Sequence, residues 1–465
     1  MKRIDHAEAS AEFLRASDHM ESHDRRLWDL RRKRDRETES LPEWQELRAL
    51  ASAIKEHALT HLADYLEEFE RNASANGAEV HWAQDAAEHN QIVFELLRSR
   101  RAMTLVKSKS MLTEECDMRP YLEARGITVV ETDLGERIQQ LDDEPPSHIV
   151  APAVHKLRRD VAEVFGRTLG ADPKNDDIHY LAEHQRQTTR PYFLKAEAGM
   201  VGANFAVAET GSVVVCTNEG NADLSINLPR LLIACIGIEK LIPRIEHLGV
   251  FIRMLSRSAL GSPITQLTTH LRAPRPGTEL HIVLVDNGRS ERLGMEDFWG
   301  SLKCIRCGAC MNTCPVYRRS GGLSYGATYS GPIGVIIDPT FNLRKYSALP
   351  FASTLNGSCT NVCPVKINIH EQIYKWREII NQRHELPIVK RETMRIAGSI
   401  MANPKLYRAA MGAAGAGVEY LPHFLLYNRL NAWGKQRELP QIPPTTFRQW
   451  YLANRVAKGA GSGTE

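Results

Sequence analysis

Four closely spaced cysteines have the pattern of a metal-cluster loop. Cys304, Cys307, Cys310 and Cys314 are followed at once by Pro315, which gives C-x2-C-x2-C-x3-C-P. This is the run that binds a [4Fe–4S] cluster in bacterial-type ferredoxins, because thiolates are the soft ligands that the irons prefer. The pattern therefore predicts an iron–sulfur protein that carries electrons.

The same pattern predicts a second cysteine segment, since the fourth cysteine of such a run normally ligates a different cluster. Cys363-Pro364 fits this requirement, with Cys359 four residues earlier. The expected ligands of the first cluster are Cys304, Cys307, Cys310 and Cys363. A cluster held in this way joins two distant segments, so we expect the region to fold only with its metal.

A second cluster lacks ligands. Aligning Cys363 with the end of the pattern places Ser353, Asn356 and Cys359 at its earlier positions. Only Cys314 and Cys359 then offer thiolates, because Ser353 is a hard oxygen donor and Asn356 a poor ligand. We expect the second cluster to be absent or labile. A smaller cluster, or one completed by a partner, are the alternatives.

Two other uses of the cysteines are disfavoured. Structural zinc usually takes two separated Cys/His pairs, not three cysteines at x2 spacing. Nine cysteines in 465 residues are too few, and odd in number, for a disulfide framework. The remaining three, Cys116, Cys216 and Cys235, are predicted to be inert buried thiols.

Chain length and net charge limit the classes of protein to which this chain can belong. A chain of 465 residues should form two to four domains, and a net charge of +3 gives no reason to expect a nucleic-acid partner. The first residues lack the apolar run of a signal peptide, and no segment offers the roughly 18 apolar residues of a transmembrane helix. We therefore expect a soluble cytoplasmic protein.

Residues 1–72 are predicted to be helical. Ser40–Glu43 resembles a capping box, and apolar residues recur every three or four positions from Trp44 to Phe69. The basic run Arg31–Arg36 is interpreted as a solvated helix face and not as a nucleic-acid patch.

Residues 73–290 alternate short apolar strands with helical patterns, which predicts an α/β domain with a largely parallel sheet. Helices are expected at Val154–Phe165 and Leu228–Ile236, and a hairpin turn at Glu209–Gly211, so that part of the sheet is antiparallel. The expected strands are Glu79–Trp82, Met103–Val106, Thr128–Glu131, His148–Ala151, Asn204–Ala208, Ser212–Thr217 and His281–Asp286.

The rest of the chain divides into a cluster domain at 291–385 and a C-terminal region at 386–465. Ala409–Gly417 is rich in alanine and glycine and suits close helix packing. The apolar stretch up to Tyr427 is expected to be buried within the protein, although it could also dock on a partner or a membrane surface. The glycine-rich tail, residues 459–463, is predicted to be disordered.

The sequence resembles the LutB-type lactate-utilisation iron–sulfur proteins over nearly its whole length. The resemblance rests on Val106–Met111, Glu131–Glu136, Pro145–His148, Asn204–Gly211, Asn218–Asn221, Val285–Ser290 and Ile305–Val316. It implies a LUD domain at 73–290, similar to the NagB/ribose-5-phosphate-isomerase group, followed by an α-helical ferredoxin module. It also implies companion proteins with which such a subunit carries electrons during oxidation of L-lactate to pyruvate. Family members often have cysteine at the position of Asn356, and some at that of Ser353, so two clusters in series are not expected here.

Polar residues of the LUD region gather at predicted strand ends, where α/β sheets place ligands. They are Lys107, Lys109, Glu131, Asp133, Glu136, Glu209, Asn218, Glu219, Asn221, Asp286 and Arg289. Lys107 and Lys109, beside Ser108 and Ser110, could hold a carboxylate or phosphate. The alternative is that these residues only shape turns and cap helices. No G-x-G-x-x-G motif lies at a strand–helix junction, so a nicotinamide or flavin Rossmann site is not supported.

Three functions follow. The first is an electron-transfer subunit of an L-lactate, or 2-hydroxy-acid, oxidation system with an unknown electron acceptor. The second is a self-contained 2-hydroxy-acid oxidoreductase whose substrate site lies in the LUD domain. The third is a scaffold in which the cluster is purely structural.

Overall fold

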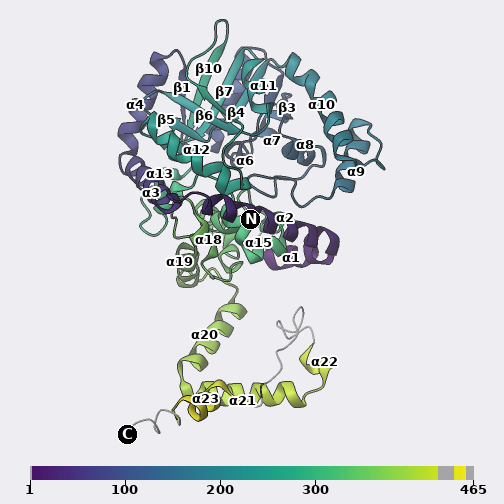
Figure 1. The fold of residues 1–465 in the computed structure, drawn as a ribbon, viewed down its shortest axis with the longest axis vertical. Helices are drawn as coiled ribbons and strands as arrows, with labels where there is room; N and C mark the ends of the chain where they lie inside the picture. The colour runs from purple at the N-terminus through teal and green to yellow at the C-terminus, as the bar shows by residue number, and fades with distance from the viewer. Residues whose placement is uncertain (1–2, 428–442, 444, 457–465) are drawn as a thin grey trace. The chain divides into compact units, whose positions relative to one another are not determined.

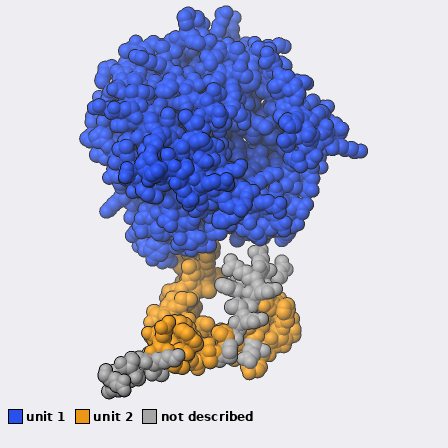
Figure 2. Space-filling model, in the orientation of Figure 1, with its two compact units in different colours: residues 1–385 blue, residues 386–465 orange. Residues whose placement is uncertain are grey.

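The computed structural model describes residues 3–427, 443 and 445–456. The chain forms two compact units, residues 1–385 and 386–465, which Figure 2 shows in different colours. The first unit contains four N-terminal helices, two β-sheets with their covering helices, and a helical segment that carries the cysteine motifs (Figure 1).

The N-terminal helices are α1 (His6–Arg15), α2 (Ser17–Glu39), α3 (Trp44–Thr60) and α4 (Leu62–Ala75). The predicted apolar stripe is buried from Trp44 to Phe69, but the helix is interrupted at His61. The capping-box prediction is wrong. Ser40 donates its hydroxyl to the carbonyl of Glu37 at the end of α2, so it closes one helix and does not start the next.

The main sheet has six strands in the order β1-β10-β7-β4-β2-β3, and every neighbouring pair is parallel. The strands are β1 (Glu79–Ala83), β2 (Thr104–Lys107), β3 (Thr128–Glu131), β4 (Ala198–Gly202), β7 (Leu231–Gly237) and β10 (Glu279–Val285). The predicted helix at Leu228–Ile236 is wrong, because β7 occupies this segment. All seven of its residues are buried, and a strand covered on both faces shows no alternation that would distinguish it from a helix.

A second sheet of four strands has the order β8-β5-β6-β9. Its strands are β5 (Phe205–Val207), β6 (Ser212–Thr217), β8 (Leu241–Ile242) and β9 (Leu267–Leu271). The hairpin at Glu209–Gly211 is confirmed, since β5 and β6 are antiparallel, but it lies in this separate sheet. Gly211 has φ +63°, and a Cβ there would lie 2.3 Å from the backbone nitrogen of Ala73, so the turn packs directly on α4.

Helices surround the sheets. They are α5 (Ala86–Ser99), α6 (Met111–Glu115), α7 (Met118–Glu123), α8 (Leu134–Leu141), α9 (Arg158–Leu169), α10 (Ile178–Lys195), α11 (Asn221–Asn227), α12 (Ile245–Leu260) and α13 (Arg289–Leu293). The expected strand at His148–Ala151 is wrong, because this segment is a loop that contacts the cysteine segment. The helix expected from Val154 begins only at Arg158.

The described part of the cysteine segment contains helices and loops without strands. Its helices are α14 (Ala309–Thr313), α15 (Pro315–Ser320), α16 (Gly331–Phe341), α17 (Leu343–Tyr346), α18 (Ser358–Val362) and α19 (Ile369–Gln382). In Figure 1, α1 and α2 lie beside α15 and α18. The first and last parts of this unit are therefore neighbours in space.

The second unit contains α20 (Ile388–Ala402), α21 (Pro404–Tyr420), α22 (His423–Leu426) and α23 (Phe447–Tyr451). The predicted burial of Ala409–Gly417 and of the stretch to Tyr427 is not found within this unit, since none of the residues described after Leu386 is buried. Alanine and glycine have little side chain with which to form a core. The tail at 459–463 lies outside the described residues. Among the helices that are described, none is long and apolar enough to cross a membrane.

Candidate iron–sulfur site and adjoining cavity

The two cysteine segments share one backbone conformation. Both place a residue in the left-handed region, then a left-handed glycine that begins a five-residue helix, then a cysteine in an extended conformation. The matching positions are Arg306 (φ 58°) and Leu355 (φ 55°), Gly308 (φ 75°) and Gly357 (φ 76°), and Cys314 and Cys363. The alignment that places Ser353 and Asn356 at ligand positions is therefore visible in the fold.

Four of the predicted ligands surround one small cavity of about 20 Å³. Its cysteines are Cys304, Cys307, Cys310 and Cys363, and its apolar walls include Ile149, Ile333, Val365, Ile367 and Ile369. Ile367 and Ile369 follow Cys363 in the chain, whereas Val316, which follows Cys314, does not line this cavity. Residues far apart in the chain thus bring four sulfur atoms to one apolar enclosure.

The donor set suits an iron–sulfur cluster. Backbone N–H groups point at two of the sulfurs, from Arg306 to Cys304 Sγ (3.4 Å) and from Ile367 to Cys363 Sγ (3.3 Å). Burial, and then the proximity of the other thiols, raises the pKa of Cys310 well above its usual range. Neutral thiols packed together in this way gain strong partners when iron displaces their protons.

The second set of positions is different. Cys314 and Cys359 are buried, but the other two positions carry oxygen. Ser353 Oγ accepts a hydrogen bond from the backbone N–H of Leu355 (3.1 Å), and Asn356 Oδ1 accepts one from that of Ser358 (3.1 Å). The bond to Ser353 corresponds to the one that Cys304 accepts from Arg306. The second loop is therefore held by its own side chains, with two thiols and two oxygens as its donor set.

The N-terminal helices place positive charge beside the cysteine loops. Arg34 donates to the carbonyl of Val362 (3.0 Å), and Arg48 donates twice to that of Cys363 (3.0 and 2.8 Å). Arg31 donates to the hydroxyl of Thr313. The basic run at 31–36 is thus not wholly a solvated face, because part of it binds the last turns of α14 and α18.

The loop at Pro145–His148 connects the α/β part of the unit to the cysteine segment. Tyr317 donates its hydroxyl to the carbonyl of Ser147 (2.7 Å), and Ser330 donates to the same oxygen (3.0 Å). His148 Nε2 lies 3.0 Å from Asn312 Oδ1. These polar residues hold the cluster loop against the α/β part.

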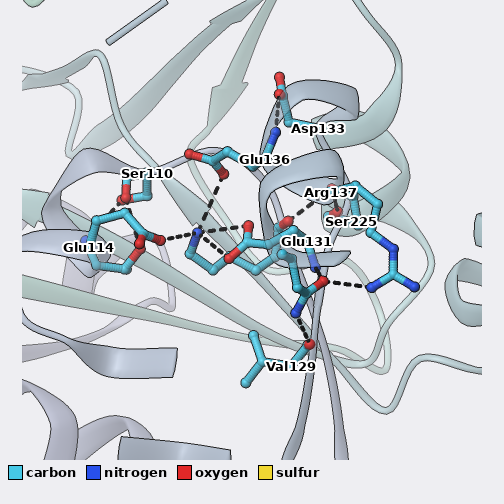
Figure 3. A network of polar contacts seen from close by, with 12 residues as sticks. Ser110, Glu114, Val129, Glu131, Asp133, Glu136, Arg137 and Ser225 are labelled. Carbon is cyan, nitrogen blue, oxygen red and sulfur yellow. Dashed lines mark hydrogen bonds and ion pairs between the residues drawn. The ribbon is translucent and has the colours of Figure 1, made fainter. Parts of the chain in front are cut away.

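Lys107 does not have the predicted ligand-binding role. Its ammonium is fully buried, lies 2.8 Å from both oxygens of Glu131, and also pairs with Glu114 (3.2 Å) and Glu136 (3.5 Å). Figure 3 shows these three carboxylates converging. Burial, which Lys107 opposes only in part, raises the pKa of Glu136 well above its usual range. Three carboxyls thus share one cation.

A larger cavity of about 520 Å³ lies beside the small one. It is lined by six of the predicted polar residues, namely Lys109, Asp133, Asn218, Glu219, Asn221 and Arg289. It is not lined by Lys107, Glu131, Glu136, Glu209 or Asp286. Glu209 accepts a hydrogen bond from the N–H of Ile245, and Asp286 accepts one from the N–H of Ser290 in α13, so both have the structural role left open above.

Cys307, Arg306 and Ile149 line both cavities, and Tyr329, Glu239 and Lys240 line the larger one. Of these residues, sequence reasoning found only Cys307. The position of Arg306 inside the C-x2-C spacing was the one available signal. Glu239 and Lys240 carry no motif.

The other three thiols lie outside the cysteine motifs. Cys116 and Cys235 are buried and Cys216 is half-buried. Burial raises the pKa of Cys235 to about 12 and that of Cys216 to about 11. The predicted burial is confirmed for Cys116 and Cys235 but not for Cys216, and Cys216 and Cys235 line the larger cavity.

Comparison with known proteins adds the family. The LUD domain model matches residues 66–290, the 4Fe-4S dicluster domain 300–367, and the C-terminal domain of lactate utilisation protein B 371–455. Lactate utilization protein B of Geobacillus thermodenitrificans is 43% identical over 429 residues, covering 89% of each chain. That of Anoxybacillus flavithermus is 43% identical over 437 residues, covering 90% of this chain and 92% of its own.

The chain belongs to the lactate utilization protein B family. It is an iron–sulfur protein of lactate utilisation with a LUD domain and a 4Fe-4S domain. A solved DUF162 family protein from Deinococcus radiodurans is 12% identical and covers 48% of this chain and 98% of its own, with a TM-score of 0.28. A likeness that weak carries no argument about the fold.

Proposed function

We propose that the protein is an electron-transfer subunit of a cytoplasmic system that oxidises L-lactate to pyruvate. The supporting observation is the convergence of Cys304, Cys307, Cys310 and Cys363 on one apolar cavity. These residues would hold one [4Fe–4S] cluster, which supplies a centre that gains and loses a single electron. Companion lactate-utilisation proteins would deliver the electrons, and an acceptor still to be identified would receive them.

One cluster is proposed, although the family model is a dicluster domain. Cys314 and Cys359 alone cannot complete a second cube, and the oxygens of Ser353 and Asn356 already accept backbone hydrogen bonds. We propose that this second position is empty or holds a labile centre. The four-part division at residues 72, 290 and 385 and the NagB-like and helical-ferredoxin assignments are part of the same proposal.

The test is the Cys307→Ser variant, purified without oxygen beside the unchanged protein. The unchanged protein should be brown and lose its colour with dithionite, and the variant should lose most of its iron. The matched control is Cys235→Ser, which removes a buried thiol from β7 and should keep the iron. Iron-free protein from the unchanged chain would overturn the proposal.

The second candidate is a self-contained 2-hydroxy-acid oxidoreductase. It is favoured by the 520 Å³ cavity, which shares Cys307 with the cluster cavity. Purified protein would be given L-lactate and an artificial electron-accepting dye without companions. Turnover would favour this candidate, and its absence would favour the carrier. A cluster that cannot be reduced and reoxidised would instead point to a scaffold.

A further inference from the structure

The larger cavity has the size and position of a ligand site. Its volume of about 520 Å³ lies within the range of small-molecule pockets, about 300–1,000 Å³. Its walls come from both the α/β part and the cysteine segment, and Cys307 is common to this cavity and the cluster cavity. A molecule bound at this end would therefore contact a residue that we propose as a cluster ligand.

Among the described residues, two cationic side chains at that end of the cavity have N–H groups without a hydrogen-bond partner. Arg306 Nη1 is buried and has no hydrogen-bond partner, while Nη2 lies 3.8 Å from Glu239 and the guanidinium stacks 4.2 Å from the ring of Tyr329. Lys240 has no hydrogen-bond or ion-pair partner among the described residues, and burial lowers the pKa of its ammonium to about 8. Both side chains line the cavity.

The third cation of this group is already paired. Arg289 donates to both oxygens of Glu115 (2.8 and 3.0 Å) and to Glu239 (2.5 Å). Arg289 is thus paired with Glu115 and Glu239, whereas Arg306 has only the longer contact to Glu239 (3.8 Å). Among the described residues, Arg306 Nη1 and the Lys240 ammonium therefore keep N–H groups that a ligand in the cavity can accept from.

The other two acidic residues of the cavity, Asp133 and Glu219, form a separate group. Burial, and then the charge of Asp133, raises the pKa of Glu219, and Lys109 is the cation near it. A polyanion would meet these carboxyls, whereas a singly charged acid can use the cationic end alone. Arg presents a planar fork that matches a carboxylate, and Lys adds a point charge.

We propose that this cavity binds the carboxylate of a small organic acid beside the cluster, through Arg306 and Lys240. The proposal rests on the proposed function, because that function supplies the acid class, a 2-hydroxy acid or its 2-oxo product. The proposed carboxylate contacts are therefore Arg306 and Lys240, and not the Lys107–Ser110 segment that the sequence suggested. It concerns binding, so it holds whether the acid is oxidised on this chain or only regulates electron transfer.

The experiment uses the anaerobic full-length protein with its cluster. Calorimetric titrations with L-lactate, pyruvate and inorganic phosphate are compared for the unchanged chain, Lys240→Met and Lys195→Met. Lys195 is an exposed residue at the end of α10 outside the cavity, so its variant matches the charge change. We expect saturable binding of a carboxylate, weakened about ten-fold or more by Lys240→Met and unchanged by Lys195→Met.

Arg306→Gln is a second test variant for the same calorimetric titrations. Iron content and circular dichroism show that each variant is folded. Acid binding should also perturb the electron paramagnetic resonance spectrum of the reduced cluster. Equal affinity in Lys240→Met and the unchanged chain would overturn the inference, as would phosphate binding at least as tight as that of both carboxylates. Iron-loaded protein that binds neither acid at about 10 mM would overturn the inference alone. Iron-free protein would overturn the proposed electron-carrier function instead.

Discussion

Replacing Lys107 by methionine should destabilise the α/β part of the protein strongly. The ammonium is 0% exposed and its partner Glu131 is 3% exposed, with 2.8 Å between the charged atoms. Methionine fills a similar volume but leaves the carboxylate of Glu131 without its cation. Removing one partner of a buried ion pair costs about 3–5 kcal/mol.

The loss of stability caused by Lys107→Met should depend on pH. Burial already raises the pKa of Glu131, so without Lys107 this carboxyl can take up a proton as the pH falls. The cost in Lys107→Met should therefore be largest near pH 8 and smaller near pH 5. The double variant Lys107→Met, Glu131→Gln should recover part of the loss, because it removes the unpaired charge.

The assay is urea unfolding followed by circular dichroism, with the cluster intact and oxygen excluded. At a slope of about 3 kcal/mol per molar urea, a loss of 3–5 kcal/mol lowers the midpoint by about 1–1.7 M. Lys109→Met is the matched control, since Lys109 donates only to the carbonyl of Val150 (2.8 Å) and should shift the midpoint far less. Equal shifts in the two variants would refute the argument that Lys107 is a structural cation.

Three further predictions concern the buried carboxyl, the cluster potential and the second loop. The folded-state pKa of Glu136 is raised, so the stability that its carboxyl contributes is present below pH 4.5 and is lost as the pH rises toward that folded value. Glu136→Gln should remove this loss and raise the free energy of unfolding near pH 8 by about 1 kcal/mol. Identical pH profiles of the urea midpoints of the variant and the unchanged chain would contradict this. Arg48→Met should lower the cluster's midpoint potential by some tens of millivolts, because Arg48 donates to the carbonyl of Cys363. For an assumed separation of about 8 Å and an effective dielectric of 20, a unit charge is worth about 2 kcal/mol, or about 85 mV before screening by solvent. Arg32→Met, on the exposed side of α2, should not shift the titration. The double variant Ser353→Cys, Asn356→Cys should raise bound iron from about four to about eight per chain, since the loop already has the backbone of the first, and an unchanged iron count would contradict that equivalence.

The sequence predicted local patterns well where spacing alone determined them. The cysteine spacing pointed to residues that meet around one cavity, and Glu209–Gly211 gave a hairpin because its turn chemistry is local. It failed at Leu228–Ile236, where burial on both faces of β7 removes the alternation that identifies a strand.

The candidate ligand site could be predicted only in part, because strand-end position does not tell whether a charge is already paired. Lys107 and Lys109 are two residues apart, yet one is neutralised by three carboxyls and the other lines the cavity. Arg306 and Lys240 lie 66 positions apart in sequence. They line the same cavity only because the cysteine segment folds against the α/β part.

The most direct test of the central claim is an iron and acid-labile sulfide count on anaerobically purified protein, with electron paramagnetic resonance of the dithionite-reduced form. We predict about four irons and four sulfides per chain and the signal of one reduced [4Fe–4S] cluster. A protein without iron would contradict the assignment of Cys304, Cys307, Cys310 and Cys363 as ligands. About eight irons with the signals of two clusters would contradict the single-cluster account.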